Sequence, residues 1–397
     1  MKTKQKMLTS TILSMSLLTV MAGAAIAPAL GIIKEHFASY PQILIQLIVS
    51  IPALFIIITN LFFLEISKHF RTRSIAICGL LLYVLSGVGC YFIDNIYALL
   101  IMRSFLGISV GLIMPLSTGL LAYYFPPESQ ARLMGLAAAM NQLGGVVATL
   151  LAGILANIKW NDSFLVYILG IVALIMVIIW LPNEQLDSKN KRGRNFEPRQ
   201  LLKFHPSVIG MLLLMMIFFI FPTNFAITAK KVTRLSTTQV TMLMVGLDVI
   251  ATIVGIMFGQ LMNIFRKPMK YFSAIFFLLS YVCFITSKGS IEFLIIGCIL
   301  SGIANGIGVP YLNTIASIKG GSNSATTVMP LLSASLYLGQ FISPIIVTPI
   351  AQTIFGKNDI FAPYKIGVII CIIFIYQVWS TRHFQSLPPT EKNRIKQ

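Results

Sequence analysis

The chain has 397 residues, of which 56% are hydrophobic and only 11% are charged, and its mean hydropathy is +0.85. A soluble domain carries about 25% charged and about 45–50% apolar residues, so the composition excludes a soluble enzyme or binding module. The net charge of +18 could indicate nucleic-acid binding, but the basic residues are scattered between apolar runs. The sequence therefore predicts an integral all-α membrane protein that binds no nucleic acid.

Twelve apolar runs follow one another, each long enough for a bilayer-spanning helix of about 20 residues. They cover residues 8–33, 43–66, 74–93, 96–125, 132–157, 163–182, 207–229, 239–264, 268–287, 290–317, 325–352 and 361–380. Internal prolines, which membrane bundles tolerate where neighbours satisfy the freed backbone groups, occur at Pro28, Pro52, Pro115, Pro222, Pro310 and Pro344. We expect twelve transmembrane helices.

The first run has an alternative interpretation. Lys2, Lys4 and Lys6 precede an apolar stretch that contains small residues, as in a cleaved secretory signal. Its length exceeds the 7–15 residues typical of a signal core, and its loss would leave an odd number of helices. We expect this segment to be retained as the first membrane helix.

The polar segments predict the orientation and the domains. Most of the 30 Lys and Arg residues fall in loops on the side of both termini, and cytoplasmic loops carry the basic excess, so we expect both ends in the cytoplasm and the chain in the plasma membrane. Residues 183–206, the long basic segment, are expected to be a cytoplasmic linker. It would join a bundle of residues 1–182 to a bundle and short tail of residues 207–397.

An internal repeat relates the two halves. The segment from Gly107 through Gly111 to Pro115 matches Gly302, Gly306 and Pro310 when the chain is shifted by 195 residues. At the same shift Gly144 falls on Gly339 and Thr149 on Pro344. GxxxG spacing lets helix backbones approach closely, and two repeated halves with a binding site between them are typical of secondary transporters. We expect two pseudo-symmetric six-helix bundles.

Four motifs resemble those of the major facilitator superfamily along essentially the whole chain. The loop after the second run and its partner after the eighth are similar to the family's loop motif, through Glu65, Lys68, Arg71, Arg73, Gly259, Asn263, Arg266 and Lys267. The fourth run carries Arg103 and Gly107, similar to Arg-x-x-Gln-Gly. The fifth carries Gly135, Gly144, Ala148, Thr149 and Gly153, similar to an antiporter signature, and we expect Gly135 and Gly144 to be helix-packing residues. The chain looks most like the twelve-helix drug:proton antiporter branch.

The resemblance carries functional expectations, and two departures bear on them. In the family the loop motif locks one conformation through charge contacts, but Lys68 replaces its acidic residue and Leu64 its glycine. Glu65 could supply a displaced acid. The fifth run lacks the proline usual in the antiporter signature. The family default is a monomer, and in related exporters an arginine at the position of Arg103 is implicated in proton coupling.

Two buried charges are candidates for handling protons. Arg103 lies inside the fourth run and Asp248 inside the eighth, at similar depth. An intramembrane charge costs about 2.5–3.5 kcal/mol on insertion scales and should face the bundle interior with a partner. We expect Arg103 and Asp248 to share or alternate contact. A snorkelling Arg103, or a purely structural pair, is the alternative.

Neutral polar residues within the runs could line a substrate cavity, or could each form a helix–helix hydrogen bond. The candidates are Gln46, Asn141, Gln142, Asn224, Asn305, Tyr337 and Gln340. The group lacks the several Arg or Lys residues that a phosphate ester would require, which favours an amphipathic or zwitterionic solute.

Missing motifs exclude other mechanisms. No GxxxxGK[ST] loop is present for ATP, and no HExxH, EF-hand or Cys/His cluster for a metal, so we expect no cofactor. The five cysteines lie within apolar runs and are expected to be inert: Cys78, Cys90, Cys283, Cys298 and Cys371. The sequence predicts a secondary transporter, and its resemblance to the drug:proton antiporter branch implies export of drugs or of an endogenous product such as a siderophore in exchange for protons. The alternatives are a proton-coupled importer and, in another class, a non-transporting membrane sensor or an integral enzyme.

Overall fold

The computed structural model describes residues 2–125, 127–184, 198–233, 235–265, 268–288, 290–320 and 328–381. Within these ranges the regular structure is entirely helical. Twelve segments are long and apolar enough to cross a membrane, which confirms the all-α membrane fold. The basic linker, apart from its two ends, lies outside the described residues, and so do Arg266 and Lys267.

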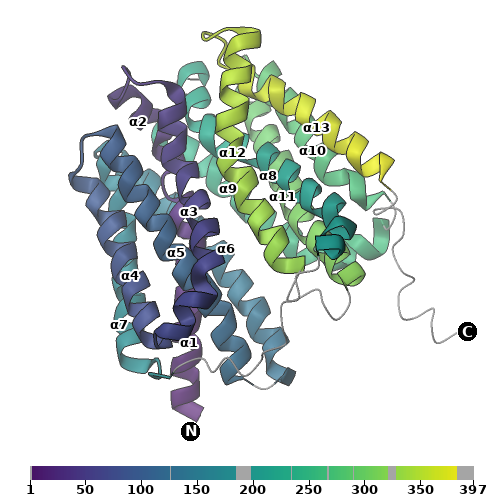
Figure 1. Cartoon of the computed structure of the whole chain (residues 1–397). Coiled ribbons are helices and arrows are strands. Elements are labelled where there is room, and N and C mark those ends of the chain that lie inside the picture. The colour runs from purple at the N-terminus through teal and green to yellow at the C-terminus, as the bar shows by residue number, and fades with distance from the viewer. Residues whose placement is uncertain are drawn as a thin grey trace, which may run out of the picture.

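The helices form two bundles that stand side by side (Figure 1). The first contains α1 (Lys2–Ala24), η1 (Ala27–Ala29), α2 (Leu30–His36), α3 (Gln42–His69), α4 (Thr72–Gly89), η2 (Cys90–Phe92), α5 (Ile96–Tyr124), α6 (Pro127–Ala156), η3 (Trp160–Ile168) and α7 (Leu169–Trp180). The second contains α8 (Pro198–Thr233), α9 (Thr237–Phe265), α10 (Met269–Thr286), α11 (Ile291–Gly320), α12 (Met329–Phe355) and α13 (Ala362–Ser380).

Local signals set several helix ends. The first membrane span is broken between α1 and α2, where Pro28 lies in the η1 turn. Asn95 caps α5 by accepting from the backbone N–H groups of Tyr97 and Ala98. Gly356 ends α12 at a φ of +87°, a left-handed conformation that glycine adopts without strain.

The two ends of the molecule are named as follows. The terminal end is the end at which α1 begins, and the far end is the end at which α2 stops and α3 begins.

The repeat found in the sequence recurs as a repeat of contacts. A Cβ on Gly107 would meet Pro52 O at 2.4 Å, and a Cβ on Gly302 would meet Leu247 O at 2.8 Å. The two carbonyls belong to Pro52 and Leu247, which are 195 residues apart, as the two glycines are. The same holds for Gly111 against Ile56 O and Gly306 against Ala251 O, and for Gly144 against Leu17 O and Gly339 against Leu212 O. The two bundles are therefore built on the same backbone approaches.

Gly135 does not belong to this set, which corrects its assignment as a helix-packing residue. A Cβ there would meet nothing within 4 Å, and the residue lines the cavity described below. The physical reason is the nine-residue separation from Gly144. At 3.6 residues per turn this is half a turn out of phase, so the two glycines lie on opposite faces of α6. Pro344 lies buried inside α12.

The two bundles meet mainly toward the far end. There α3 contacts α12, α6 contacts α9, and α2 contacts α8. Close backbone approach is possible because Gly31 faces Ala226 O and Gly153 faces Thr241. The line along which the bundles touch, called the seam below, therefore lies near the far end. The space between the bundles lies on its terminal side, and the candidate site is in this space.

The glycine contacts predict an asymmetric response to a single methyl group. Gly144→Ala should destabilise the protein by about 1–3 kcal/mol, because the added Cβ overlaps a backbone carbonyl that has no room to move. Gly119→Ala on α5, where a Cβ meets nothing within 4 Å, should be neutral or stabilising by up to about 1 kcal/mol. Thermal unfolding in detergent measures both, and equal melting temperatures would contradict the assigned contact.

Candidate substrate cavity

A cavity of about 730 Å³ lies between the bundles. Its walls come from α1, α3 and α6 on one side and from α8, α9, α11 and α12 on the other. Apolar and aromatic side chains dominate, among them Phe218, Phe219 and Phe221. Membrane transporters bind their substrates at such a junction of two repeats, and the volume suits a drug-sized molecule.

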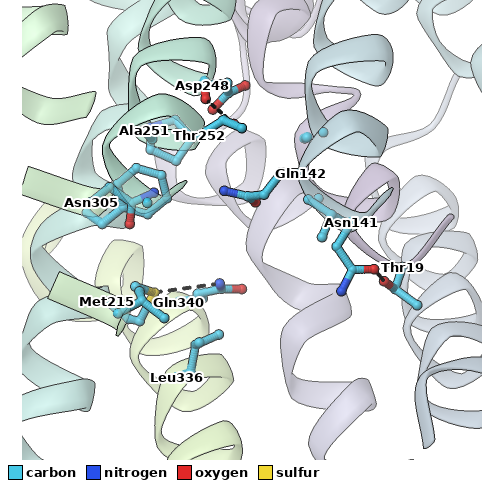
Figure 2. A pocket seen from close by; sticks show the side chains of 18 of the residues that line it. Thr19, Asn141, Gln142, Met215, Asp248, Ala251, Thr252, Asn305, Leu336 and Gln340 are labelled. Carbon is cyan, nitrogen blue, oxygen red and sulfur yellow. Dashed lines mark hydrogen bonds between the residues drawn. The ribbon is translucent and has the colours of Figure 1, made fainter. Parts of the chain in front are cut away.

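Five of the seven polar candidates lie on the cavity wall: Asn141, Gln142, Asn305, Tyr337 and Gln340. Figure 2 shows Gln142 extending into the space between the bundles, opposite Asn305 and Gln340. Thr19 Oγ1 donates to Asn141 Oδ1 at 2.9 Å, so Asn141 is held against α1. Gln340 Nε2 has only a long contact of 3.9 Å to Met215 Sδ, which leaves its amide available to a solute.

Asp248 projects from α9 into the same cavity. Thr149 Oγ1, on α6 of the other bundle, donates to Asp248 Oδ2 at 3.3 Å. Among the described residues that line the cavity, Asp248 carries the one charged side chain. A single carboxylate in a mostly apolar cavity, with a contact across the bundle interface, can bind either a proton or a positively charged group of a solute.

Arg103 is fully buried and lies behind the cavity wall. Its Nε donates to Ile48 O at 2.7 Å, one Nη donates to Ala22 O at 2.6 Å, and the other donates to the hydroxyl of Tyr167. These bonds tie α5 to α3, α1 and η3. The expected contact with Asp248 is not formed in this conformation: Arg103 donates to these three acceptors, and Asp248 accepts from Thr149 instead.

The partners of Arg103 follow from two interruptions of helices. Pro52 lies four residues after Ile48 and has no N–H to donate, so the Ile48 carbonyl lacks its helical partner. Ala22 lies in the last turn of α1, where carbonyls are left without intrahelical donors, and it also accepts from Tyr167 Oη at 3.0 Å. The planar guanidinium, with five donors in a fixed fork, reaches both carbonyls at once.

Gln46 and Asn224 lie outside the cavity, which corrects their expected place in its wall. They lie further toward the far end, where Gln46 Nε2 donates to Asn224 Oδ1 at 2.7 Å across the interface. Thr348 Oγ1 completes the contact by donating to Gln46 Oε1. Sequence reasoning missed Thr348, because one threonine in an apolar helix carries no distinguishing signal.

Other lining residues were also missed. Thr19, Thr252 and Asn313 add hydroxyl and amide groups to the wall. Thr19 and Thr252 are common helix residues, but Asn313 lies eight residues after Asn305 on the same helix. Eight residues are close to two full turns, so this spacing could have identified Asn313 as a partner of Asn305 on one face.

The loop after α3 is charged and exposed. Lys68 Nζ donates to Glu65 Oε2 at 2.6 Å, and this hydrogen bond together with the lysine charge lowers the pKa of Glu65. Arg73 donates to Ile178 O and Arg71 precedes α4. Gly259 and Asn263 lie exposed near the end of α9. Glu65 and Lys68 lie in the last turns of α3, just before the loop, where they form an exposed i,i+3 pair that contributes little stability.

The whole chain was compared with known proteins. The model of the Major Facilitator Superfamily matches residues 12–344. The chain belongs to this family. It is therefore a multi-pass membrane transporter and not an enzyme.

Two curated relatives match part of the chain. Quinolone resistance protein NorA of Staphylococcus aureus (strain MSSA476) is 30% identical over 216 residues, which are 52% of this chain and 53% of NorA. Riboflavin transporter RibZ of Clostridioides difficile (strain 630) is 25% identical over 173 residues, 43% of this chain and 37% of RibZ. The matches thus span between about a third and about a half of these relatives.

Solved structures agree on the fold. A bacterial homologue of the human lysosomal transporter Spinster, in an inward-facing and occupied conformation, superposes with a TM-score of 0.80 at 14% identity. The match covers 97% of this chain and 99% of that one. At this identity the likeness establishes the fold and says nothing of the solute.

The geometry around Arg103 predicts that this position requires the forked shape of the guanidinium as well as its positive charge. Arg103→Lys should lower stability by about 1–3 kcal/mol, because an ammonium group cannot reach Ile48 O, Ala22 O and Tyr167 together and leaves a buried carbonyl unpaired. In a Pro52→Ala background the restored N–H can bond to Ile48 O, so the penalty should shrink. A double-mutant cycle on detergent melting curves measures the coupling. Equal penalties in both backgrounds would contradict it.

Proposed function

We propose that this transporter exports a small amphipathic or zwitterionic molecule across the plasma membrane in exchange for protons. Asp248 is the residue that carries the proposal, because it is the one charged side chain among the described residues of the cavity wall. Proton and solute can compete for this carboxylate, so that binding of one releases the other. That competition is the minimum requirement for exchange.

The lining supports this class of solute. Aromatic side chains such as Phe218 and Tyr337 offer apolar contact, and the amides of Gln142, Asn305 and Gln340 offer hydrogen bonds. The described residues of the cavity wall include no Arg or Lys, the side chains that would favour a phosphate ester. NorA carries quinolone resistance in its name, which favours drugs as the exported solute, and an endogenous product such as a siderophore is the other candidate.

The orientation decides which compartment loads the cavity. We place both termini in the cytoplasm on the basic excess of the loops, and the far end then faces outward. Bonds between the bundles cluster at the far end, whereas on the terminal side Tyr337 Oη contacts Met114 Sδ at 3.2 Å, a weak acceptor. The conformation would thus load solute from the cytoplasm. The protein is proposed to act as a monomer without a cofactor.

The role of Arg103 is proposed to be indirect. The resemblance implies proton coupling through this arginine, but its donors hold the backbone of α1 and α3 next to the cavity. Ala22 and Pro52 belong to the cavity wall, so Arg103 positions the wall against which the solute and Asp248 interact.

An importer is the second candidate function. RibZ is named a riboflavin transporter, and a cavity of this composition would also accept a planar vitamin. Export and import can be told apart by the direction of solute movement in membrane vesicles that hold a proton gradient. An exporter concentrates a solute in everted vesicles with an acidic interior, and a proton-coupled importer does not.

The central test is Asp248→Asn in everted vesicles with an acidic interior, with a fluorescent quinolone and riboflavin as probes. We expect gradient-driven accumulation of at least one probe, and its reduction by tenfold or more in Asp248→Asn because the amide takes up no proton. Exchange of labelled for unlabelled probe without a gradient needs no proton and should persist through the aromatic and amide contacts of the cavity, with weaker binding of the probe because the carboxylate is lost.

The matched control is Glu292→Gln, which removes an exposed carboxylate at the far end and should leave accumulation unchanged. Undiminished gradient-driven accumulation in Asp248→Asn would remove Asp248 from the mechanism. Accumulation only in right-side-out vesicles would replace export by import.

A further inference from the structure

We propose that Gln46, Asn224 and Thr348 are the gate residues that close the cavity at its far end. These three side chains, called the far-end gate below, come from α3, α8 and α12. The proposal rests on transport by alternating access, which this fold performs between two repeats. It holds for either direction of transport and does not require that Asp248 carries the proton.

The gate is a continuous chain of hydrogen bonds between the two bundles. Thr348 Oγ1 donates to Gln46 Oε1 at 2.5 Å, and Gln46 Nε2 donates to Asn224 Oδ1 at 2.7 Å. Asn224 Nδ2 in turn donates to Ile220 O at 2.9 Å. Gln46 thus holds two helices of the second bundle, and Gln42 Nε2, one turn earlier on α3, supports the contact by also donating to Asn224 Oδ1 at 3.2 Å.

The chain is buried. Gln46 is 0% exposed, and Asn224 and Thr348 are each 2% exposed. Buried amides without partners cost about 1–3 kcal/mol each, but here every link has a partner. Moving the bundles apart at the far end must break the bonds at Gln46 while water replaces them. The gate is thus stable when closed and can also be satisfied when open.

The surrounding contacts define where the gate works. Gly31 allows α2 to approach Ala226 O, and Gly153 allows α6 to approach Thr241. Glu35 pairs with Lys230 across the same seam, but the glutamate is 60% exposed, and exposed ion pairs contribute little. Asn157 Nδ2 donates to Thr238 Oγ1 at 2.8 Å, also in an exposed position. The far-end gate is the buried polar part of this seam.

The same helices connect the gate to the cavity. Val49, Pro52 and Ala53 follow Gln46 along α3 and line the cavity, and Phe221 and Pro222 precede Asn224 along α8 and do the same. A solute that displaces these wall residues acts on helices that carry the gate. This is the geometry that a transporter needs to link occupancy of the site to opening at the far end.

The test measures distances between spin labels on the full-length chain in liposomes, with the five native cysteines replaced. One pair of labels, at Lys159→Cys and Lys357→Cys, spans the bundles at the far end. A second pair, at His69→Cys and Ser380→Cys, spans them at the terminal end. All four positions lie in exposed parts of the described chain.

Removal of one partner should open the gate. Gln46→Leu leaves the buried Thr348 hydroxyl without its partner and leaves Asn224 Oδ1 with only the longer bond from Gln42 Nε2, so the population with a longer far-end distance should rise roughly tenfold. The terminal pair should shorten in parallel. Thr348→Val removes one bond, keeps nearly the same shape, and should shift the populations in the same direction by a smaller factor.

Removal of all partners should close it again. In Gln46→Leu/Asn224→Leu/Thr348→Val the three side chains that bonded to one another are all apolar, and Gln42, which is only partly buried, can turn its amide to water. Apolar side chains then pack well in the closed seam. The closed population should return to at least that of the unsubstituted gate. Ser301→Ala breaks a buried bond to Ser280 inside the second bundle and should leave both distances unchanged.

Two results would overturn the proposal. Unchanged far-end distances in both Gln46→Leu and Thr348→Val would show that these bonds do not hold the seam. A triple variant as open as Gln46→Leu would show that hydrogen-bond satisfaction is not what closes it. Neither result bears on proton coupling through Asp248, because the distances are measured without a proton gradient.

Discussion

Backbone carbonyls freed inside an apolar environment must find donors within the protein, and this constraint shapes the cavity wall. The span formed by α1 and α2 is broken at Pro28 and α3 contains Pro52, and hydrocarbon offers no water to either break. Arg103 donates to a carbonyl at each. A charge that is costly to bury is thereby retained, because its fork of donors stabilises two interrupted helices beside the solute site.

In the second half a neutral donor reaches Ile217 O, the carbonyl that corresponds to Ala22 O at the offset of 195 residues. Tyr281 donates to Ile217 O on α8, as Tyr83 donates to Leu18 O on α1 at 3.3 Å. No arginine stands at the position equivalent to Arg103, where Cys298 is found. The repeat is therefore symmetric in its glycine contacts and asymmetric in charge. Each half contributes differently to the cavity, and its one acid, Asp248, comes from the second half.

Much of the architecture could be predicted because it depends on patterns along the chain. Hydropathy located the twelve spans, and the offset of 195 residues between Gly107 and Gly302 anticipated backbone approaches that the structure repeats. The intramembrane position of Asp248 identified it as the charged residue of the site region. Each of these signals is local or periodic and needs no knowledge of how helices are tilted.

The remaining features depend on depth and on partners from distant helices. Gln46 lies on the same face of α3 as Val49 and Ala53, but one turn nearer the far end, where the bundles touch. No local pattern states where two tilted bundles begin to separate. Likewise, the bonds of Arg103 depend on interruptions in α1 and α3. The similar depth of Asp248 predicted an acidic partner, which the fold does not supply in this conformation.

Exchange at this site requires that a solute displaces a proton from the cavity acid, Asp248. The direct measurement is proton release on addition of a transported solute to the unbuffered, detergent-solubilised protein, followed with a pH indicator. We expect release that saturates with solute binding and disappears in Asp248→Asn. Equal release from Asp248→Asn, or solute binding to the unsubstituted protein without any release at any starting pH, would contradict exchange at this carboxylate.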